Sequence, residues 1–193
     1  TQKETIKRVE IPVEMLVETT QPAYIKYDSN GNELSDSHQQ WSCVHDTRNG
    51  LIWEVKSKED TMRRPDYLYS WFDPDNKGLK GTADGGRCKG GVDCDTSSYI
   101  EAINQKKLCG YDDWRLPTRE EMMGLVSFDG GYKKVKIDTS YFPETLPSWY
   151  WTASSNQSRP EFAWYILFNN GIPLNDLKEN PEHIRLVRNA SSS

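Results

Sequence analysis

The stretch Gly110–Thr118 reads GYDDWRLPT and joins two segments whose residue patterns predict helices. Before it, residues 95–108 begin with a capping candidate, Asp95 or Thr96, and continue with apolar side chains at helical spacing. We expect this helix to end at Gly110, because glycine readily takes the left-handed conformation that closes a helix. After it, Thr118 and Glu121 have the spacing of a capping box, which predicts a second, short helix.

Strand patterns lie on both sides of these helices. Residues 41–55 hold two short apolar runs around Asn49-Gly50, a pair typical of a β-hairpin turn. Residues 149–152, 162–168 and 183–188 predict later strands, and the middle one is apolar on both faces, as a central strand is. The order of strands, two helices and strands, without β-α-β alternation, predicts an α+β fold with antiparallel sheets.

Residues 1–40 are expected to form a β-rich N-terminal extension. Within it, residues 7–17 alternate apolar and polar side chains, as a strand does, and residues 29–32 (SNGN) have the composition of a turn. We place one main domain at residues 41–189 and a short tail at residues 190–193.

The charge and hydropathy of the chain argue against two classes of partner. The net charge is −5 and the pI is about 5.3, which disfavours nucleic-acid binding as the main function. No run approaches the ~20 apolar residues that cross a bilayer, so we expect no membrane-spanning segment. The chain begins at Thr1 without Met, as a processed or trimmed protein does.

The four cysteines lack the paired CxxC spacing of zinc sites, so disulfides are the favoured interpretation. Cys88 and Cys94 enclose a short Gly-rich segment that closes easily, which leaves Cys43 and Cys109 as the long-range pair. Disulfides persist in oxidising compartments. We therefore expect a secreted, periplasmic or cell-surface protein.

Residues 73–84 resemble part of a calcium loop, with acids at Asp73, Asp75 and Asp84. However, Lys77 stands where an oxygen ligand belongs, and no helical pattern flanks the loop. An Asp/Gly-rich turn is therefore the favoured interpretation. Calcium is the only cofactor that the sequence suggests.

Within the GYDDWRLPT stretch, we expect Trp114 to lie in the core and Arg115 to pair with Asp112 or Asp113. The adjacent carboxylates could form an acid/base pair, but a turn is favoured, because neighbours in sequence need not converge on one substrate. Residues 56–66 are rich in charge and predict a solvated loop.

Several blocks of the sequence carry a family resemblance. They are DTRNGLIWE (46–54), LCGYDDWRLPTREEM (108–122), IDTSYFP (137–143), YWTAS (150–154), AWYILFNNG (163–171) and IRLVR (184–188). In this order they resemble the family typified by the C-terminal domain of the Legionella collagen-like adhesin (Lcl), over about residues 41–189. The resemblance implies a C-type-lectin-like fold, related to formylglycine-generating enzymes and retroelement-diversified receptors, in bacterial surface or secreted proteins. For the adhesin it also implies binding of sulfated glycans, which the acidic charge of this chain does not support.

The resemblance further implies that segments between the late strands, residues 154–161 and 172–182, present the binding face. Trp149, Tyr150 and Trp151 alternate across a strand, and which of them faces outward stays open. The candidate ligand-binding residues are Trp149, Trp151, Ser154, Asn156, Gln157, Arg159, Asn175 and Asp176.

No feature of the sequence supports nucleophilic catalysis, because the three His residues are scattered and no Ser lies in a GxSxG setting. We therefore expect an adhesin-like binding module without enzymatic activity, whose ligand is a glycan or a surface protein. One alternative is a structural or pilus-associated subunit that assembles through a strand in residues 1–40. Another is a sugar-active enzyme that uses Asp112 and Asp113. The sequence leaves the ligand and the oligomeric state open.

Overall fold

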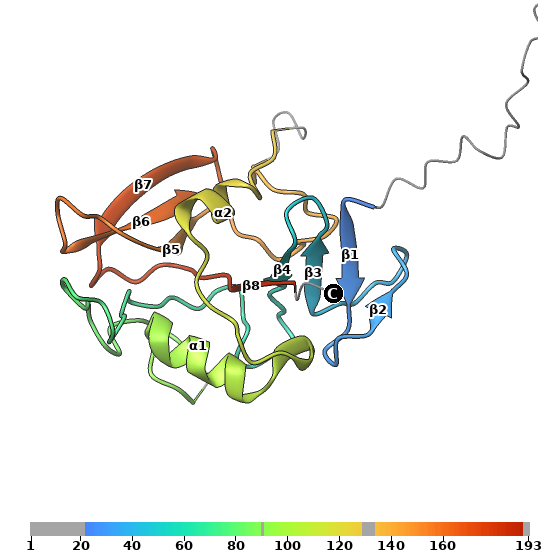
Figure 1. Cartoon of the computed structure of the whole chain (residues 1–193), viewed down its shortest axis with the longest axis horizontal. Helices are drawn as coiled ribbons and strands as arrows, with labels where there is room; N and C mark the ends of the chain where they lie inside the picture. The colour runs from blue at the N-terminus through green and yellow to red at the C-terminus, as the bar shows by residue number, and fades with distance from the viewer. Residues whose placement is uncertain (1–21, 90, 129–133, 191–193) are drawn as a thin grey trace, which may run out of the picture.

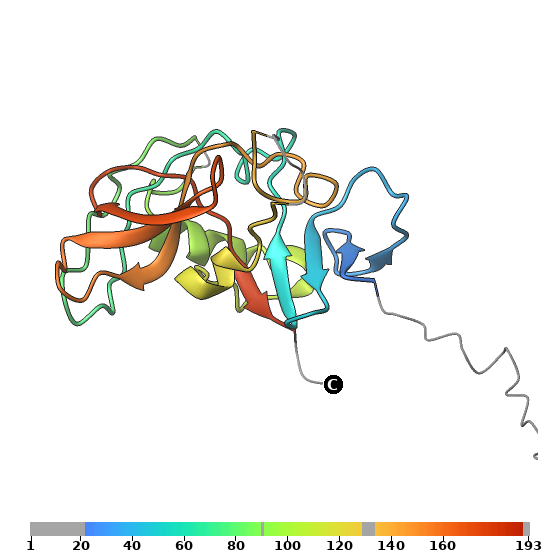
Figure 2. The same cartoon turned by 90° about the horizontal axis from the view of Figure 1, so that it is seen from above.

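The computed structural model describes residues 22–89, 91–128 and 134–190. In chain order its elements are β1 (Tyr24–Tyr27), β2 (Glu33–Leu34), β3 (Cys43–Asp46), β4 (Leu51–Glu54), α1 (Thr96–Gln105), a 3-10 helix (Leu108–Gly110), α2 (Arg119–Met123), β5 (Trp149–Ser155), β6 (Phe162–Leu167), β7 (Ile172–Leu177) and β8 (Val187–Asn189). A five-stranded and a three-stranded antiparallel sheet lie toward opposite ends of the molecule (Figures 1 and 2). The predicted α+β class with antiparallel sheets and two α-helices is confirmed.

The larger sheet has the strand order β2-β1-β3-β4-β8. Its β3–β4 hairpin confirms the predicted turn, where Gly50 has a φ of 69°. The predicted turn at residues 29–32 joins β1 to β2, and β1 pairs with β3. Residues 24–34 therefore share a sheet with the hairpin of the main domain. The predicted strand at residues 7–17 and the end of the tail, residues 191–193, lie outside the described residues.

The helix ends follow the predicted caps with one difference. The Asp95 carboxylate accepts the N–H of Ser98 at 2.8 Å, and the capping box of α2 is complete. However, α1 ends at Gln105, and Lys107 takes the left-handed conformation first, with a φ of 51°. The prediction that Gly110 closes this helix is therefore wrong, because Gly110 ends the 3-10 helix that follows.

The β1–β2 turn packs directly on the link between the helices. The N–H of Cys109 donates to the Ser29 carbonyl at 3.0 Å. Gly31 has a φ of 88°, and a Cβ atom there would overlap the Cys109 carbonyl oxygen. The disulfide between Cys43 and Cys109 joins the same link to β3. Backbone contact and a covalent bond thus hold the link against the larger sheet.

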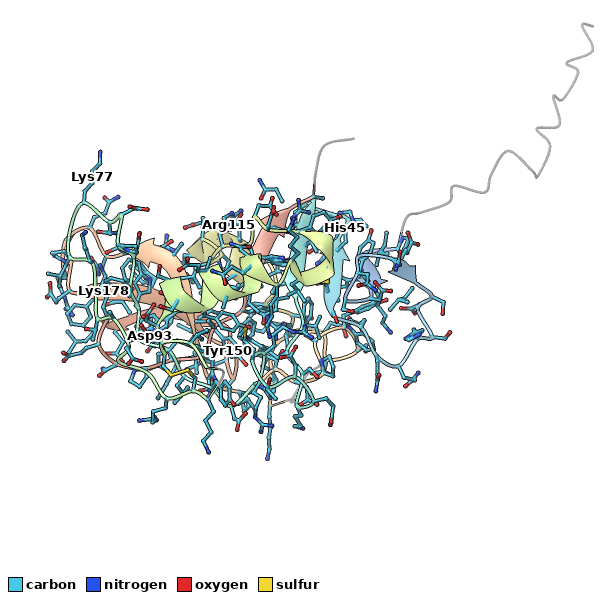
Figure 3. All side chains as sticks on the ribbon, turned by 90° about the horizontal axis from the view of Figure 1, so that it is seen from below. His45, Lys77, Asp93, Arg115, Tyr150 and Lys178 are labelled. Carbon is cyan, nitrogen blue, oxygen red and sulfur yellow. A yellow bond between two sulfur atoms is a disulfide. The ribbon has the colours of Figure 1, made fainter. Side chains whose placement is uncertain are left out.

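Arg115 does not pair with Asp112 or Asp113, so that prediction is wrong. Its backbone pairs with Val187, and its guanidinium donates to both carboxylate oxygens of Glu121 at 2.7 Å. The side chain is thereby directed to the start of α2, away from the adjacent acids. Figure 3 shows Arg115 beside α1, near the middle of the molecule.

The prediction of a solvated loop at residues 56–66 is wrong for two of its cations. Lys56 and Arg63 are buried. Lys56 Nζ lies 2.9 Å from the carboxylate of Glu54, and Arg63 donates to the Val55 carbonyl at 2.8 Å. These buried contacts attach the loop to the end of β4.

The smaller sheet has the order β5-β6-β7, which confirms β6 as its central strand. A turn at residues 169–171 joins β6 to β7. Residues 172–182 were expected to lie between strands, but Ile172–Leu177 forms β7. Pro173 lowers the strand signal of this segment, and an edge strand tolerates a proline that a central strand does not. The predicted last strand, residues 183–188, is shorter and later, since β8 spans Val187–Asn189.

In the described part of the chain, the buried side chains form two hydrophobic clusters. Trp114 lies in the cluster that also holds Trp71 and Tyr99, so its predicted place in the core is confirmed. Its Nε1 donates to the Leu108 carbonyl at 3.0 Å, which satisfies the buried indole N–H.

Both predicted disulfides, Cys43–Cys109 and Cys88–Cys94, are present. Such bridges fit an oxidising, extracellular or secretory compartment. Among the described residues, none of the helices has the length and apolar character needed to span a membrane.

Candidate functional site

The acids of the predicted calcium loop do not converge. Asp73 accepts the N–H of Asp75 at 2.9 Å, whereas Asp84 accepts the N–H of Cys94 at 2.8 Å. In residues 22–89, 91–128 and 134–190, no three His, Cys, Asp or Glu side chains form a group that could hold a metal ion. Asp73 and Asp84 instead accept hydrogen bonds from the backbone of their own loop.

Several predicted ligand-binding residues lie on opposite faces of the three-stranded sheet. Paired residues of antiparallel strands share a face, and successive residues of one strand alternate between faces. Trp151 pairs with Tyr165, so both lie on one face. Trp164 pairs with Asn175, and both lie on the other face. The sheet therefore offers two separate surfaces.

We call the surface that carries Trp164 and Asn175 the arginine face. It comprises Arg119, Ser154, Arg159, Phe162, Trp164 and Asn175. The guanidinium carbon of Arg119, the first residue of α2, lies 4.7 Å from the centroid of the Trp164 ring. The guanidinium carbon of Arg159 lies 3.7 Å from the ring centroid of Phe162. Because a strand rises about 3.3 Å per residue, these two rings lie about 7 Å apart along β6.

The arginines of this face keep donors for a ligand. Arg119 pairs with its exposed neighbour Glu120 at 2.9 Å, and Arg159 makes no ion pair with any residue that the structure describes. A guanidinium that stacks on a ring leaves its N–H groups at the edge, where carboxylate or sulfate can accept them. Ser154 lies alongside, with its Oγ accepting the backbone N–H of Arg119 at 3.1 Å.

The turn between β5 and β6 borders the arginine face. The side-chain oxygen of Asn156 accepts the N–H groups of Ser158 and Arg159 at 3.0 and 3.1 Å, so Asn156 shapes the turn. Gln157 is exposed in this turn. Figure 3 shows Lys77 and Lys178 at the same end of the molecule.

An apolar pocket of about 360 Å³ adjoins the arginine face. Its lining includes Thr118 and Ala153, which are the chain neighbours of Arg119 and Ser154, and the ring of Trp71. A ligand on the arginine face therefore has an apolar recess beside it.

We call the opposite surface, which carries Tyr165, the acidic face. It comprises Trp149, Tyr165, Leu174, Asp176 and Glu182. The Trp149 side chain is 44% exposed, and its ring centroid lies 6.1 Å from that of Tyr165. Leu174 pairs with Tyr165 across the strands and is also 44% exposed. Trp151 was expected to contact ligand, but it is fully buried, and its Nε1 donates to the Tyr69 carbonyl at 2.9 Å.

The two carboxyl groups of the acidic face influence each other. Glu182 is only 5% exposed. Burial, and then the charge of Asp176, raise the pKa of Glu182 to about 8, against the opposing charge of Arg87. Burial and both carboxyl groups also raise the pKa of the Tyr165 hydroxyl. At neutral pH, Glu182 therefore holds a proton.

Sequence reasoning missed Arg119, Phe162 and Trp164 on one face, and Tyr165 and Glu182 on the other. The alternation of residues 162–167 indicated that its aromatic rings divide between two faces. No local signal placed Arg119 over Trp164, because that contact depends on how α2 packs on β6.

Comparisons with known proteins give one family. The family model described as the Lcl C-terminal domain matches residues 42–188. Comparison with curated proteins and comparison with solved structures give no significant match. The matched range contains both faces of the three-stranded sheet and both α-helices.

Proposed function

This chain belongs to the Lcl C-terminal domain family, and we propose that it is a secreted or surface-exposed, adhesin-like binding module that binds acidic glycans through its arginine face. The family resemblance to a collagen-like adhesin supports binding in place of catalysis. The disulfides support a periplasmic or extracellular setting.

One observation carries the choice of ligand: the guanidinium groups of Arg119 and Arg159 stack on two rings of the same face of β6. Guanidinium binds carboxylate and sulfate through paired N–H donors. Stacking also restrains each long side chain, so less rotamer entropy is lost when a ligand binds. Two such cations can hold two acidic groups of one glycan.

The net charge of −5 does not oppose this proposal. Charges farther away than about 8 Å are largely screened at physiological ionic strength, so the arginine face sets its own potential. A guanidinium already covers each ring, so a neutral sugar would have to displace Arg119 or Arg159 in order to stack. The arrangement therefore favours an acidic sugar over a neutral one.

The test compares a sulfated or uronic-acid oligosaccharide with a neutral oligosaccharide of equal length, using calorimetry on the full chain. We expect Arg119→Gln and Arg159→Gln each to weaken binding of the acidic sugar about tenfold, the loss of one charge-assisted contact. Lys106→Gln removes a charge at an exposed site of another surface and serves as the matched control. Unchanged binding in both arginine variants would refute the site, and equal binding of the neutral sugar would refute the ligand class.

The alternative proposal is assembly through strand addition. The sheet edges at β2 and β7 are poorly suited to it. At one edge β2 spans only two residues, Glu33–Leu34. At the edge strand β7, Pro173 has no N–H, and Asp176 accepts the N–H of Leu177 at 2.8 Å. Light scattering of the full chain against a deletion of residues 1–21 tests assembly through the N-terminal segment. Equal monomer mass for both would exclude it.

A further inference from the structure

The acidic face has the features of a second binding site, on the opposite side of the sheet from the arginine face. From the juxtaposition of two carboxyl groups with an exposed apolar rim, we infer that the acidic face binds the side chain of a lysine presented by a partner protein. This inference goes beyond the proposed glycan binding and does not depend on it.

Glu182 carries the first part of the argument. Its side chain is 5% exposed, yet no hydrogen bond or ion pair to its carboxyl group exists among the described residues. The backbone of Glu182 is satisfied, since its N–H and carbonyl both pair with Tyr69 at 3.0 and 2.8 Å. Among the described residues, the enclosed side-chain atoms without a partner do not include the carboxyl oxygens of Glu182, so these oxygens reach the surface, where a donor from outside can meet them.

Asp176 supplies the second carboxyl group. Its Oδ1 accepts the N–H of Leu177 at 2.8 Å and the amide of Asn180 at 3.0 Å, which fixes its orientation. The structure gives its Oδ2 no hydrogen bond within the described residues. The carboxyl groups of Asp176 in β7 and of Glu182 before β8 are thus close enough to influence each other. Arg87 is the cation whose charge opposes the rise in the pKa of Glu182.

The rim favours an amine on an aliphatic stem. Trp149 and Leu174 are each 44% exposed, and Ile172, on the same face of β7, is 47% exposed. Lysine places four methylene groups against apolar surface and an ammonium group at its end. An amino sugar would press hydroxyl groups against the same apolar side chains. A calcium ion would need more oxygen ligands than these two carboxylates provide.

The experiment uses the full chain with Nα-acetyl-lysine N-methylamide as the probe and the norleucine analogue as its uncharged match. The indole signal of Trp149 in NMR spectra, assigned with Trp149→Phe, reports binding. We expect the lysine probe to shift this signal in a saturable way and the norleucine analogue to leave it unchanged. An equal shift with norleucine, with glucosamine or with Ca²⁺ would overturn the inference.

Variants and pH provide the second arm. Glu182→Gln should weaken lysine binding at least tenfold, whereas Glu179→Gln, an exposed neighbour, should leave it unchanged. Because bound ammonium favours ionised Glu182, affinity should rise about tenfold or more between pH 6 and pH 9. Glycan binding should persist in Glu182→Gln, which separates this inference from the proposed function. Equal affinity at both pH values, or full affinity in Glu182→Gln, would refute it.

Discussion

Glu54 joins three segments of the chain through a single buried carboxylate. Its Oε1 lies 2.9 Å from Lys56 Nζ and accepts the hydroxyl of Tyr99, and its Oε2 accepts the N–H of Leu186 at 2.9 Å. Burial lowers the pKa of Lys56 to about 8, and the charge of Glu54 opposes this shift. Loss of this carboxylate would leave buried donors without an acceptor.

We predict that Glu54→Gln lowers the free energy of unfolding by about 3 to 5 kcal/mol, because it leaves Lys56 as an uncompensated buried cation. Urea denaturation at pH 7 measures the loss. Glu33→Gln, at an exposed site, is the control and should change stability little. The double variant Glu54→Gln, Lys56→Met should recover part of the loss, and no recovery would contradict the pairing as the cause.

His183 should make stability depend on pH in acid. Burial lowers its pKa to about 4, although Nδ1 donates to the Tyr67 carbonyl at 3.1 Å. The unfolded chain takes up a proton near pH 6.5, whereas the folded chain resists until about pH 4, so stability falls as the pH drops through this range. Over that range we expect up to about 3 kcal/mol more loss than in His183→Gln, measured by urea denaturation. Parallel pH profiles of the two proteins would contradict this assignment.

At the scale of elements, the sequence predicted those whose signals are local. The N-caps of both helices, the β3–β4 turn and the central strand β6 follow from side-chain chemistry and periodicity within a few residues. The edge strand β7 was not predicted because Pro173, Asn175 and Asp176 have weak strand propensity. Its pairing with β6 stabilises the extended conformation that local propensity does not favour. The end of α1 was misplaced because Lys107 takes a conformation that sequence assigns to glycine.

The contact between the β1–β2 turn and the helix link gives a prediction at this scale. Gly31→Ala should lower the free energy of unfolding by more than about 2 kcal/mol, because the new Cβ meets the Cys109 carbonyl and φ is positive. Gly50→Ala is the matched control, since its φ is also positive but nothing lies within 4 Å of the new Cβ. Thermal denaturation of both variants measures the difference. Equal losses would show that the contact with Cys109 contributes nothing.

For the whole molecule, the candidate ligand-binding residues predicted from the sequence lie on or beside the three-stranded sheet, but the sequence did not divide them between its two faces. Arg159 and Asn175 share a surface with Trp164, whereas Trp149 and Asp176 lie on the opposite one with Tyr165. A bulge in β5 between Trp151 and Ser155 changes the register there, so counting along the strand does not assign the later residues. The placement of Arg119 over Trp164 depends on how α2 packs on this sheet.

Disulfide removal should affect global stability unequally. The Cys43–Cys109 bridge closes a loop with a sequence separation of 66, and the Cys88–Cys94 bridge closes one of 6. The chain-entropy model assigns them about 4 and about 2 kcal/mol. We expect Cys43→Ser with Cys109→Ser to lower Tm more than Cys88→Ser with Cys94→Ser, by scanning calorimetry of each double variant. A larger drop for the short loop would contradict the model.

The long bridge also has a mechanical consequence. When a folded chain is pulled from its two ends, each released residue lengthens it by about 3.4 Å. The Cys43–Cys109 bridge prevents the segment between these residues, a sequence separation of 66, from extending. The pulled chain is therefore about 220 Å shorter than it would be without the bridge. About a third of the 193-residue chain therefore bears no load in oxidising surroundings. The region shielded from force includes α1, both partners of the shorter bridge and the whole loop of residues 56–66, which contains the buried Lys56.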